Sequence, residues 1–422
     1  MRAISATLAA SLTLLASVAL GASPPAASAA TSPQQSLLGT LNNGMRAAGS
    51  FSGAYVQDLT TDQTLYANNA GTSRLPASVE KLFTTSTALL DFGPNATLTT
   101  SILGLGHEAG GTFTGTLYLR GGGDPTFGSS GFIHANYGAG ASIQQLVSNL
   151  KAATGMRALI GNVVADDSRF DSLRGTPATG FGPSIEVEGE LNAVAFDRGW
   201  ANNEGTVYFK RPVLETGQRF VAALKSAGIK VPRRVSVTTG RAAPTASTLA
   251  VVHSPRIAKL ISLTNTPSDN FFAETLLKDV GARFGTGGTT AGGAAAVRAK
   301  LAQSFGIHPR LNDGSGLSRF DRTTPMDVVS LLRQMAGNPA FVGSLAIAGE
   351  TGTLVSEMRH TDAQGRCRGK TGSLHDVSNV VGYCTARDGH TLAYALMMNG
   401  IVPYYAHPIQ NRMEVALADY TG

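Results

Sequence analysis

The sequence lacks most of the features by which several protein classes are recognised. It has two cysteines, which leave one possible disulfide pairing. Its eight histidines are scattered without a His-x-x-x-His or His-Glu-x-x-His pattern, so we expect no metal and no cofactor. Lys and Arg form no dense run, although the formal net charge is +6, and nucleic acid is therefore not an expected partner. Beyond the N-terminal segment, no apolar run approaches the length of a membrane span.

The N-terminal segment has the pattern of a secretory signal peptide. A positive start at Arg2 precedes an apolar run from Leu8 to Leu20, and Ala27-Ser28-Ala29 fits a cleavage site. We expect residues 1–29 to be removed, which leaves no transmembrane segment in the mature chain. The mature protein is then secreted, periplasmic or cell-wall-associated, and its small positive excess suits an anionic setting such as a wall.

The patterns of the mature chain change along its length. Alternating runs between residues 51 and 70 predict a β-hairpin, and an apolar helix follows Ser78. Residues 95–250 alternate strand-like pieces with glycine-rich loops, after which helical patterns return and three strand-like runs end the chain. The predicted strands are 98–105, 115–120, 162–166, 207–209, 367–374, 377–384 and 391–398; the predicted helices are 142–154, 218–228, 254–262, 268–284, 292–305 and 324–336; and 242–249 is a predicted exit linker.

This order predicts an α/β (α+β) fold in which a central antiparallel sheet takes strands from both ends of the chain. Residues 30–94 and 251–422 would form that domain. Residues 95–250 would interrupt it as an inserted, β-rich α/β accessory region.

The first motif with chemical meaning is Ser78-x-x-Lys81, at the start of the apolar helix. Residues three apart lie on one helix face, so the two side chains can touch. A serine hydroxyl needs an adjacent base to act as a nucleophile, and a lysine whose pKa is lowered by burial can serve. Taken alone, the pattern also fits an N-cap serine beside a solvated lysine.

Two further motifs follow. Ser268-Asp269-Asn270 opens a predicted helix, where an N-cap is the simpler interpretation. Lys370-Thr371-Gly372-Ser373 lies in a predicted strand, where a charged edge residue beside a bulge is the simpler one. Each motif is common alone. The three in this order, each in its expected setting, are the trio found in penicillin-binding proteins and class A β-lactamases.

On these motifs the chain resembles the penicillin-binding proteins of the D-alanyl-D-alanine carboxypeptidase/endopeptidase kind, in the low-molecular-mass class with an insertion after the first motif. Four other stretches share the resemblance: 119–126, 161–170, 312–319 and 348–354. The resemblance implies a serine penicillin-binding, β-lactamase-like transpeptidase domain. It also implies a hydrolase that acts on peptidoglycan stem peptides, with β-lactam antibiotics as covalent inhibitors.

The resemblance assigns the catalytic steps to three side chains. Ser78 attacks the penultimate carbonyl with Lys81 as its base, and Ser268 relays the proton to the leaving amine. The backbone N–H groups of Ser78 and Ser373 form the oxyanion hole.

The remaining motif residues are assigned to substrate binding. Asn270 would hydrogen-bond the substrate amide. Lys370 and Thr371 would hold the terminal carboxylate, whose charge explains the need for a cation, and Gly372 and Ser373 complete this edge of the site.

Two alternatives belong to other classes. A serine β-lactamase is suggested by Glu188-Gly189-Glu190-Leu191-Asn192, which resembles the class A motif whose glutamate activates water. Here that segment precedes Ser268, so Glu188 would reach Ser78 only if the insertion folded back specifically. We interpret the segment as the start of a strand and expect deacylation to lack a dedicated glutamate. A non-catalytic cell-wall-binding protein is the other alternative, although all the chemical groups of the motifs are present.

The two cysteines are predicted to form a disulfide. If 367–374 and 377–384 form a hairpin that turns at His375-Asp376, Leu374 lies opposite Val377 and Cys367 lies opposite Cys384. Opposed residues of an antiparallel pair are close enough for the bond after a small adjustment. A slip of one residue would instead place the two side chains on opposite faces.

Overall fold

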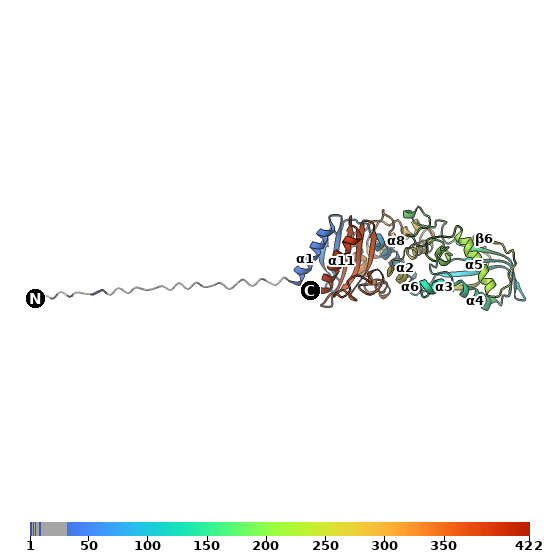
Figure 1. Ribbon diagram of the computed structural model, residues 1–422, viewed down its shortest axis with the longest axis horizontal. Coiled ribbons are helices and arrows are strands. Elements are labelled where there is room, and N and C mark those ends of the chain that lie inside the picture. Colours follow the sequence, from blue (N-terminus) through green and yellow to red (C-terminus); the bar gives the residue numbers. More distant parts are fainter. Residues whose placement is uncertain (2, 4, 6–7, 10–31) are drawn as a thin grey trace. The chain divides into compact units, whose positions relative to one another are not determined.

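Two β-sheets organise the part of the chain from Pro33 to Gly422, which forms one compact unit (Figure 1). The structure is a computed structural model that describes residues 1, 3, 5, 8, 9 and 32–422. The predicted signal peptide lies largely outside these residues and stays a prediction. Among the residues described, no helix combines the length and the apolar character needed to cross a membrane.

The elements follow the predicted order closely. The strands are β1 (Gly53–Asp58), β2 (Gln63–Asn68), β3 (Thr99–Ala109), β4 (Thr112–Arg120), β5 (Ala158–Asp166), β6 (Val237–Thr239), β7 (Ser247–His253), β8 (Ala346–Ile347), β9 (Cys367–Leu374), β10 (Val377–Thr385) and β11 (Thr391–Asn399). The α-helices are α1 (Pro33–Ala48), α2 (Lys81–Phe92), α3 (Ser130–Asn136), α4 (Ile143–Thr154), α5 (Pro212–Ser226), α6 (Ile257–Asn265), α7 (Asn270–Phe284), α8 (Thr290–Phe305), α9 (Pro325–Met335), α10 (Pro339–Gly343) and α11 (Pro403–Asp419). Four 3₁₀ turns are η1 (Ala77–Glu80), η2 (Pro177–Thr179), η3 (Phe196–Gly199) and η4 (Gly352–Leu354).

The larger sheet is antiparallel, in the order β2-β1-β11-β10-β9-β8. Because β1 pairs with β11, the sheet takes strands from both ends of the chain, and this prediction is confirmed. Alternate residues of β11 enter two different cores: Ala393 and Met397 pack with α9, whereas Leu392 and Leu396 pack with α1 and α11. The sheet is therefore covered on both faces, with α1 and α11 side by side on one of them (Figure 1).

The predicted disulfide is confirmed. Strands β9 and β10 pair in the expected register, with Leu374 opposite Val377 and Cys367 opposite Cys384. The two sulfurs are bonded, and the Cα atoms lie 4.1 Å apart. The bond joins the strand that carries Lys370 to its neighbour.

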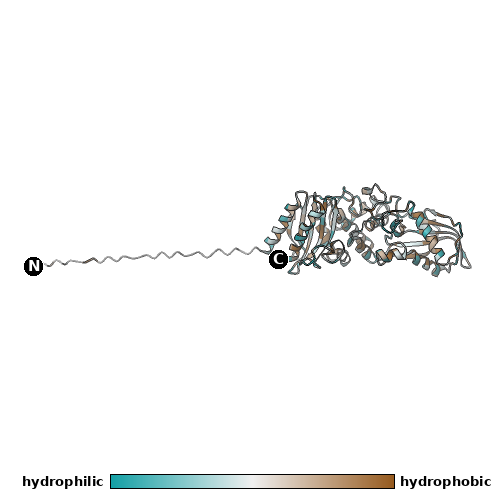
Figure 2. Cartoon of the chain, in the orientation of Figure 1, coloured by the Kyte–Doolittle hydropathy of each residue, from teal (hydrophilic) through white to brown (hydrophobic). Residues whose placement is uncertain are grey.

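The smaller sheet has the order β6-β5-β4-β3-β7 and uses only residues between Thr99 and His253. Strands β4, β5 and β6 run parallel, whereas β3 is antiparallel to both of its neighbours. The amphipathic helices α4 and α5 bury their apolar sides against this sheet (Figure 2). The sheet lies within the region predicted as an insertion, and the exact domain boundaries stay a prediction.

Three predictions about elements are wrong or incomplete. Residues 242–249 are not only a linker, because β7 begins at Ser247 and pairs with β3, far away in sequence. Residues 207–209 form no strand; Tyr208 makes a single bridge to Trp200. Helices α1 and α11 were not predicted, and α11 contains Pro408, which obscures a helical pattern.

Candidate active site

The turn before α2 carries Ser78 into the space between the larger sheet and the helices. Ser78 lies in the 3₁₀ turn η1, which leads directly into α2 at Lys81. Ala77 has a positive φ of 47°, a conformation that costs a non-glycine residue about 1–3 kcal/mol. Such strain persists only where the surrounding structure fixes the backbone, as it does around this serine.

Two glycines allow the neighbouring segments to approach this turn. A Cβ on Gly372 would lie 2.6 Å from the Pro76 carbonyl oxygen and 3.2 Å from the Ser78 nitrogen. A Cβ on Gly316, whose φ is +83°, would lie 1.9 Å from the Ala77 carbonyl oxygen. The glycine of the Lys-Thr-Gly motif is thus required for strand β9 to pack against the serine.

Lys81 is completely buried and holds three acceptors. Its Nζ lies 2.8 Å from Ser78 Oγ, 2.5 Å from Asn270 Oδ1 and 2.8 Å from the Ser315 carbonyl oxygen. Burial lowers the pKa of Lys81 to about 8, against the opposing charge of Glu188 and other carboxylates. In the neutral amine, two N–H bonds suffice for Asn270 and Ser315, which leaves the lone pair for the Ser78 hydroxyl.

The second motif comes to the same place from the start of α7. Ser268 has a positive φ of 70°, and Asp269 caps the helix by accepting from the Phe272 N–H at 2.9 Å. Asn270 accepts from Lys81 and donates through Nδ2 to the Glu186 carbonyl oxygen at 2.6 Å. The N-cap interpretation therefore holds for Asp269, while Asn270 faces Lys81.

The third motif closes the site. Lys370 Nζ donates to Ser268 Oγ and to the Thr371 carbonyl oxygen, both at 2.7 Å. Burial, and then the charge of Lys81, lowers the pKa of Lys370 well below its ordinary value. The Thr371 hydroxyl lies 2.8 Å from the hydroxyl of Thr353, which precedes Leu354 at the end of η4. The structure thus brings all three motifs together.

Arg198, which the sequence analysis missed, supports the second motif from the region predicted as an insertion. Its guanidinium is paired with Asp269 and donates to the Tyr137 hydroxyl at 2.6 Å. It also lies 5.3 Å from the ring centroids of Phe271 and Phe272. Removing one partner of such a buried pair typically costs about 3–5 kcal/mol, so Arg198 fixes the start of α7.

Glu188 also reaches this site, and the interpretation of its segment as the start of a strand is wrong. The segment is a turn closed by a bridge between Ser184 and Gly189. It folds back so that Glu188 Oε2 accepts from the backbone N–H of Asn270 at 2.8 Å. Nothing local in the sequence could show this, because the contact depends on how the inserted region packs on α7.

Comparison with known proteins agrees with this geometry. The profile of the D-Ala-D-Ala carboxypeptidase 3 (S13) family matches residues 34–181 and 184–420, nearly all of the described part of the chain. This chain belongs to that family. It is a serine-type D-Ala-D-Ala carboxypeptidase of the penicillin-binding kind, and hence a hydrolase.

Two relatives and one solved structure illustrate the similarity. The D-alanyl-D-alanine carboxypeptidase of Actinomadura sp. (strain R39) is 27% identical over 89% of this chain and 82% of its own length. Carboxypeptidase DacB of Mycolicibacterium smegmatis is 32% identical over 82% of this chain and 76% of its own. The crystal structure of penicillin binding protein 4 (dacB) from Haemophilus influenzae matches with a TM-score of 0.73 at 19% identity, over 89% of this chain and 97% of that one. The predicted family and fold class are confirmed.

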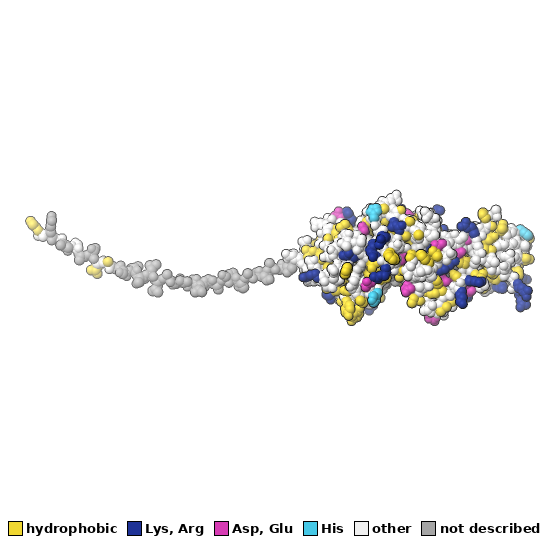
Figure 3. Space-filling model, turned by 90° about the horizontal axis from the view of Figure 1, so that it is seen from above, with side chains coloured by type: hydrophobic (Ala, Val, Ile, Leu, Met, Phe, Trp, Pro, Cys, Tyr) yellow, Lys and Arg dark blue, Asp and Glu magenta, His cyan; other side chains and the backbone are white. Residues whose placement is uncertain are grey.

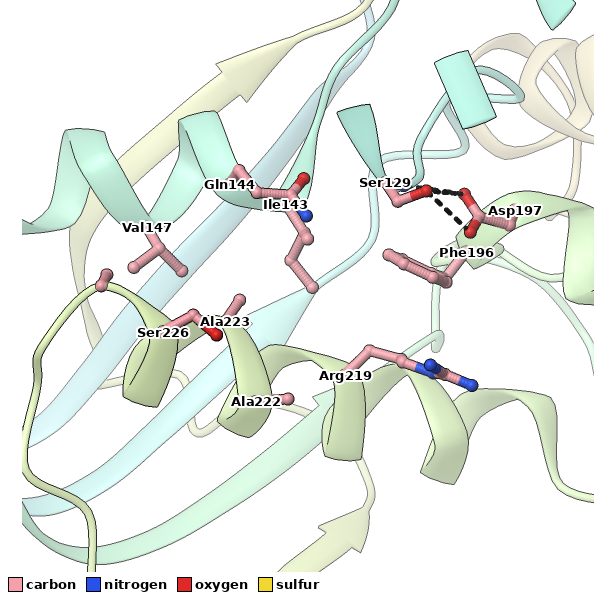
Figure 4. Close-up of a pocket in the computed structure, with 11 residues that line it drawn as sticks. Ser129, Ile143, Gln144, Val147, Phe196, Asp197, Arg219, Ala222, Ala223 and Ser226 are labelled. Atoms are coloured by element: carbon pink, nitrogen blue, oxygen red, sulfur yellow. Dashed lines mark hydrogen bonds between the residues drawn. The ribbon is translucent and has the colours of Figure 1, made fainter. Parts of the chain in front are cut away.

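A cavity elsewhere in this carboxypeptidase is separate from the motifs. It measures about 510 Å³ and lies between α4 and α5 of the inserted region (Figure 4). At its edge the Ser129 hydroxyl bonds both carboxylate oxygens of Asp197, at 3.3 and 3.1 Å, and Arg219 lies nearby. None of its lining residues belongs to a motif, so it is not the catalytic centre.

A group of three buried carboxyls includes Glu80, which lies in η1 two residues after Ser78. Oxygen atoms of Glu80, Asp313 and Asp321 come within 4.8 Å of one another, and among the residues described these are the one group spaced to hold a metal ion. Both carboxyl oxygens of Glu80 lack a hydrogen-bond partner. Burial, and then the charges of Asp321 and Asp313, raises the pKa of Glu80 well above its ordinary value. The raised pKa favours a proton on Glu80, and a proton shared with Asp321 would give one of these two oxygens a hydrogen bond.

Replacing Glu80 with glutamine will stabilise the protein at neutral and alkaline pH. When the pKa of a carboxyl is higher in the folded than in the unfolded state, its contribution to the free energy of unfolding is complete below the unfolded-state pKa. That contribution is lost as pH rises toward the folded-state pKa. We therefore expect Glu80→Gln to match the wild type near pH 4 and to be the more stable of the two near pH 8, because glutamine loses no proton on unfolding; each unit by which the folded pKa exceeds the unfolded pKa contributes about 1.4 kcal/mol. Denaturant unfolding at both pH values measures this. The exposed Glu204→Gln serves as control, and an equal effect of Glu80→Gln at both pH values would contradict the shared proton.

Proposed function

We propose that this enzyme releases the terminal D-alanine of peptidoglycan stem peptides through an acyl-enzyme on Ser78. The observation that carries the proposal is the hydrogen bond between Ser78 Oγ and a buried Lys81 whose pKa is lowered to about 8. At pH 7 about one tenth of such lysines are neutral and can act as a base. Asn270 and Ser315 hold the amine in place and so fix the direction of its lone pair.

In the first half-reaction, Ser78 Oγ bonds to the penultimate carbonyl carbon while its proton passes to Lys81. The oxyanion forms between the backbone N–H groups of Ser78 and Ser373, and losing one such donor typically costs about 2.7–4 kcal/mol. When the C–N bond breaks, the proton reaches the leaving amine through Ser268 Oγ. Ser268 suits this relay because Lys370 donates to its oxygen and leaves its own proton free to move.

The substrate is held at both sides of the reacting bond. Lys370 and Thr371 bind the terminal carboxylate, and Asn270 bonds the substrate amide with its second amide hydrogen. Gly372 and Ser373 supply the backbone edge along which the peptide lies. Hydrolysis of D-alanyl cross-links, the endopeptidase reaction, is the same chemistry on a longer leaving group.

β-Lactams are proposed to acylate Ser78, since they present an amide carbonyl and a carboxylate in a similar arrangement. A structure of the Haemophilus influenzae protein is described as complexed with a β-lactam. We place the mature enzyme outside the cytoplasm, at the cell wall, where its substrate lies. Figure 3 shows one face of the protein, on which Lys and Arg side chains gather at several places with Asp and Glu side chains among them.

Incubation with fluorescently labelled penicillin and with a peptide ending in D-Ala-D-Ala tests the proposal. We expect a stoichiometric adduct, located at Ser78 by mass spectrometry, and release of D-alanine from the peptide. Ser78→Ala should lose both while its circular dichroism is unchanged. Penicillin hydrolysis without D-alanine release would favour the β-lactamase, and neither adduct nor release would favour the non-catalytic wall-binding protein.

A further inference from the structure

Glu188, in the region predicted as an insertion, lies at the catalytic motifs and has a strained backbone conformation. Its φ of +65° is in the left-handed region, which a non-glycine residue adopts at a cost of about 1–3 kcal/mol. The turn aims the side chain at the start of α7, where Oε2 accepts from Asn270 N–H. The side chain of the same Asn270 accepts from Lys81, which in turn contacts Ser78.

Within the described part of the chain, only one oxygen of the Glu188 carboxylate contacts other protein groups. Its contacts with Asn270 N–H at 2.8 Å and with Arg198 at 3.9 Å both use Oε2. Among the residues described, Oε1 has no hydrogen-bond partner, and 40% of the side chain is exposed. Oε2 thus anchors the carboxylate at the start of α7, while the partly exposed Oε1 is accessible to a water molecule.

We propose that Glu188 is the general base that activates water for hydrolysis of the acyl-enzyme. The inference rests on the acyl-enzyme at Ser78 proposed above, and it adds a catalytic residue for the second half-reaction. Of the Glu188–Asn192 segment, we assign only Glu188 to this step. The side chain of Asn192 is buried and makes local hydrogen bonds, to the Glu190 carbonyl oxygen and from the Val194 N–H.

The step balances with water as the only co-reactant. The Glu188 carboxylate takes a proton from water while the water oxygen bonds to the ester carbon. The tetrahedral intermediate then breaks its bond to Ser78 Oγ, which takes up the proton from Glu188 by way of Lys81: the amine, left neutral by acylation, accepts that proton and passes one to Ser78. The products are the shortened peptide acid and free Ser78, with Glu188 again ionised and Lys81 again neutral.

The charges around Glu188 suit a base that works near neutral pH. Burial, and then the negative charge of Asp269, raises the pKa of Glu188 to about 7. The Asn270 N–H, Arg198 and Lys81 act in the opposite direction. Tyr208 is a further titratable group near Glu188; burial, and then the charge of Glu188, raises the pKa of that tyrosine. A base is most effective when its pKa lies near the working pH.

This position of Glu188 revises the expectation that deacylation lacks a dedicated glutamate. The test separates acylation from deacylation by measuring each rate constant with a chromogenic β-lactam and a depsipeptide substrate. Variants are Glu188→Gln, which keeps the hydrogen bond to Asn270 in part and removes the base, and Glu188→Asp, which restores a carboxylate. Glu186→Gln in the same turn is the matched control, since its carboxylate is exposed and only its backbone carbonyl contacts Asn270.

We expect wild-type deacylation to rise with pH and to level off above about pH 7, a measurement that needs no variant. Glu188→Gln should slow deacylation by about 10²-fold, the lower end of the range for a general base, abolish this pH dependence and leave acylation within threefold. Glu188→Asp should recover part of the rate, and Glu186→Gln should change neither step. Deacylation unaltered in Glu188→Gln, a wild-type rate that does not respond to pH, or equal losses in both steps would overturn the assignment. Absence of any adduct in the wild type would instead remove the proposed function itself.

Discussion

Replacing Lys81 with methionine will slow acylation of Ser78 by about 10²–10⁴-fold, the range for loss of a general base, while the protein remains folded. Methionine fills a similar volume in this completely buried position but cannot accept the serine proton. Wild-type acylation should rise with pH up to about 8, because the pKa of Lys81 is lowered to that value by burial and only the neutral amine accepts the proton. Lys81→Met should lose that pH dependence together with the rate.

Stopped-flow measurement of adduct formation from about pH 5 to 9 tests both expectations. The exposed Lys259→Met is the control for loss of one positive charge, and thermal unfolding reports whether Lys81→Met is folded. Lys81→Met need only be folded; a lower melting temperature than the wild type is expected, because Asn270 and Ser315 each lose a hydrogen-bond donor. Acylation by Lys81→Met within tenfold of the wild type would show that another group takes the proton.

Local patterns in the sequence were sufficient for much of the fold. The β1–β2 hairpin, helix α7 and the pairing of β9 with β10 were predicted because apolar spacing and turn residues decide them within a few residues. The disulfide followed from that register. Strand β7 was missed in part because its partner β3 is distant in sequence, and no local pattern specifies such a pairing.

For the site, too, contacts between residues close in sequence were predicted, and contacts between distant residues were not. Ser78 and Lys81 were predicted to touch because residues three apart lie on one helix face, and their 2.8 Å contact confirms it. The roles of the motif residues came from resemblance, and they stay proposals. Arg198 was missed, and Glu188 was singled out but interpreted as part of a strand, since both reach α7 only through the packing of residues 95–250.

Buried charge was the least predictable feature. Glu80 stands between Ser78 and Lys81 in the sequence, where it could equally have faced solvent. Its burial beside Asp321 follows from the 3₁₀ geometry of η1 and from the loop that packs against it. Such tertiary packing, and not residue type, decides whether a carboxyl keeps its proton.

Replacing Lys370 with methionine will impair a substrate that ends in a free carboxylate far more than the same peptide ending in an amide. A hydrogen bond to a charged group contributes about 1.5–3 kcal/mol, so the free acid should lose about 10- to 100-fold more in kcat/KM than the amide. In the absence of substrate, burial keeps the pKa of Lys370 well below its ordinary value. An arriving carboxylate raises that pKa, so binding of the free acid should take up a proton.

Parallel assays of D-alanine and D-alaninamide release, each between about pH 6 and 9, measure the difference. In the wild type, the preference for the free acid should fall as pH rises, because proton uptake becomes costlier; in Lys370→Met the preference should be small at every pH. The amide reaction also reports on the contact between Lys370 and Ser268, since both substrates need the proton relay. Equal losses for acid and amide would therefore assign Lys370 to the relay alone and remove it from carboxylate binding.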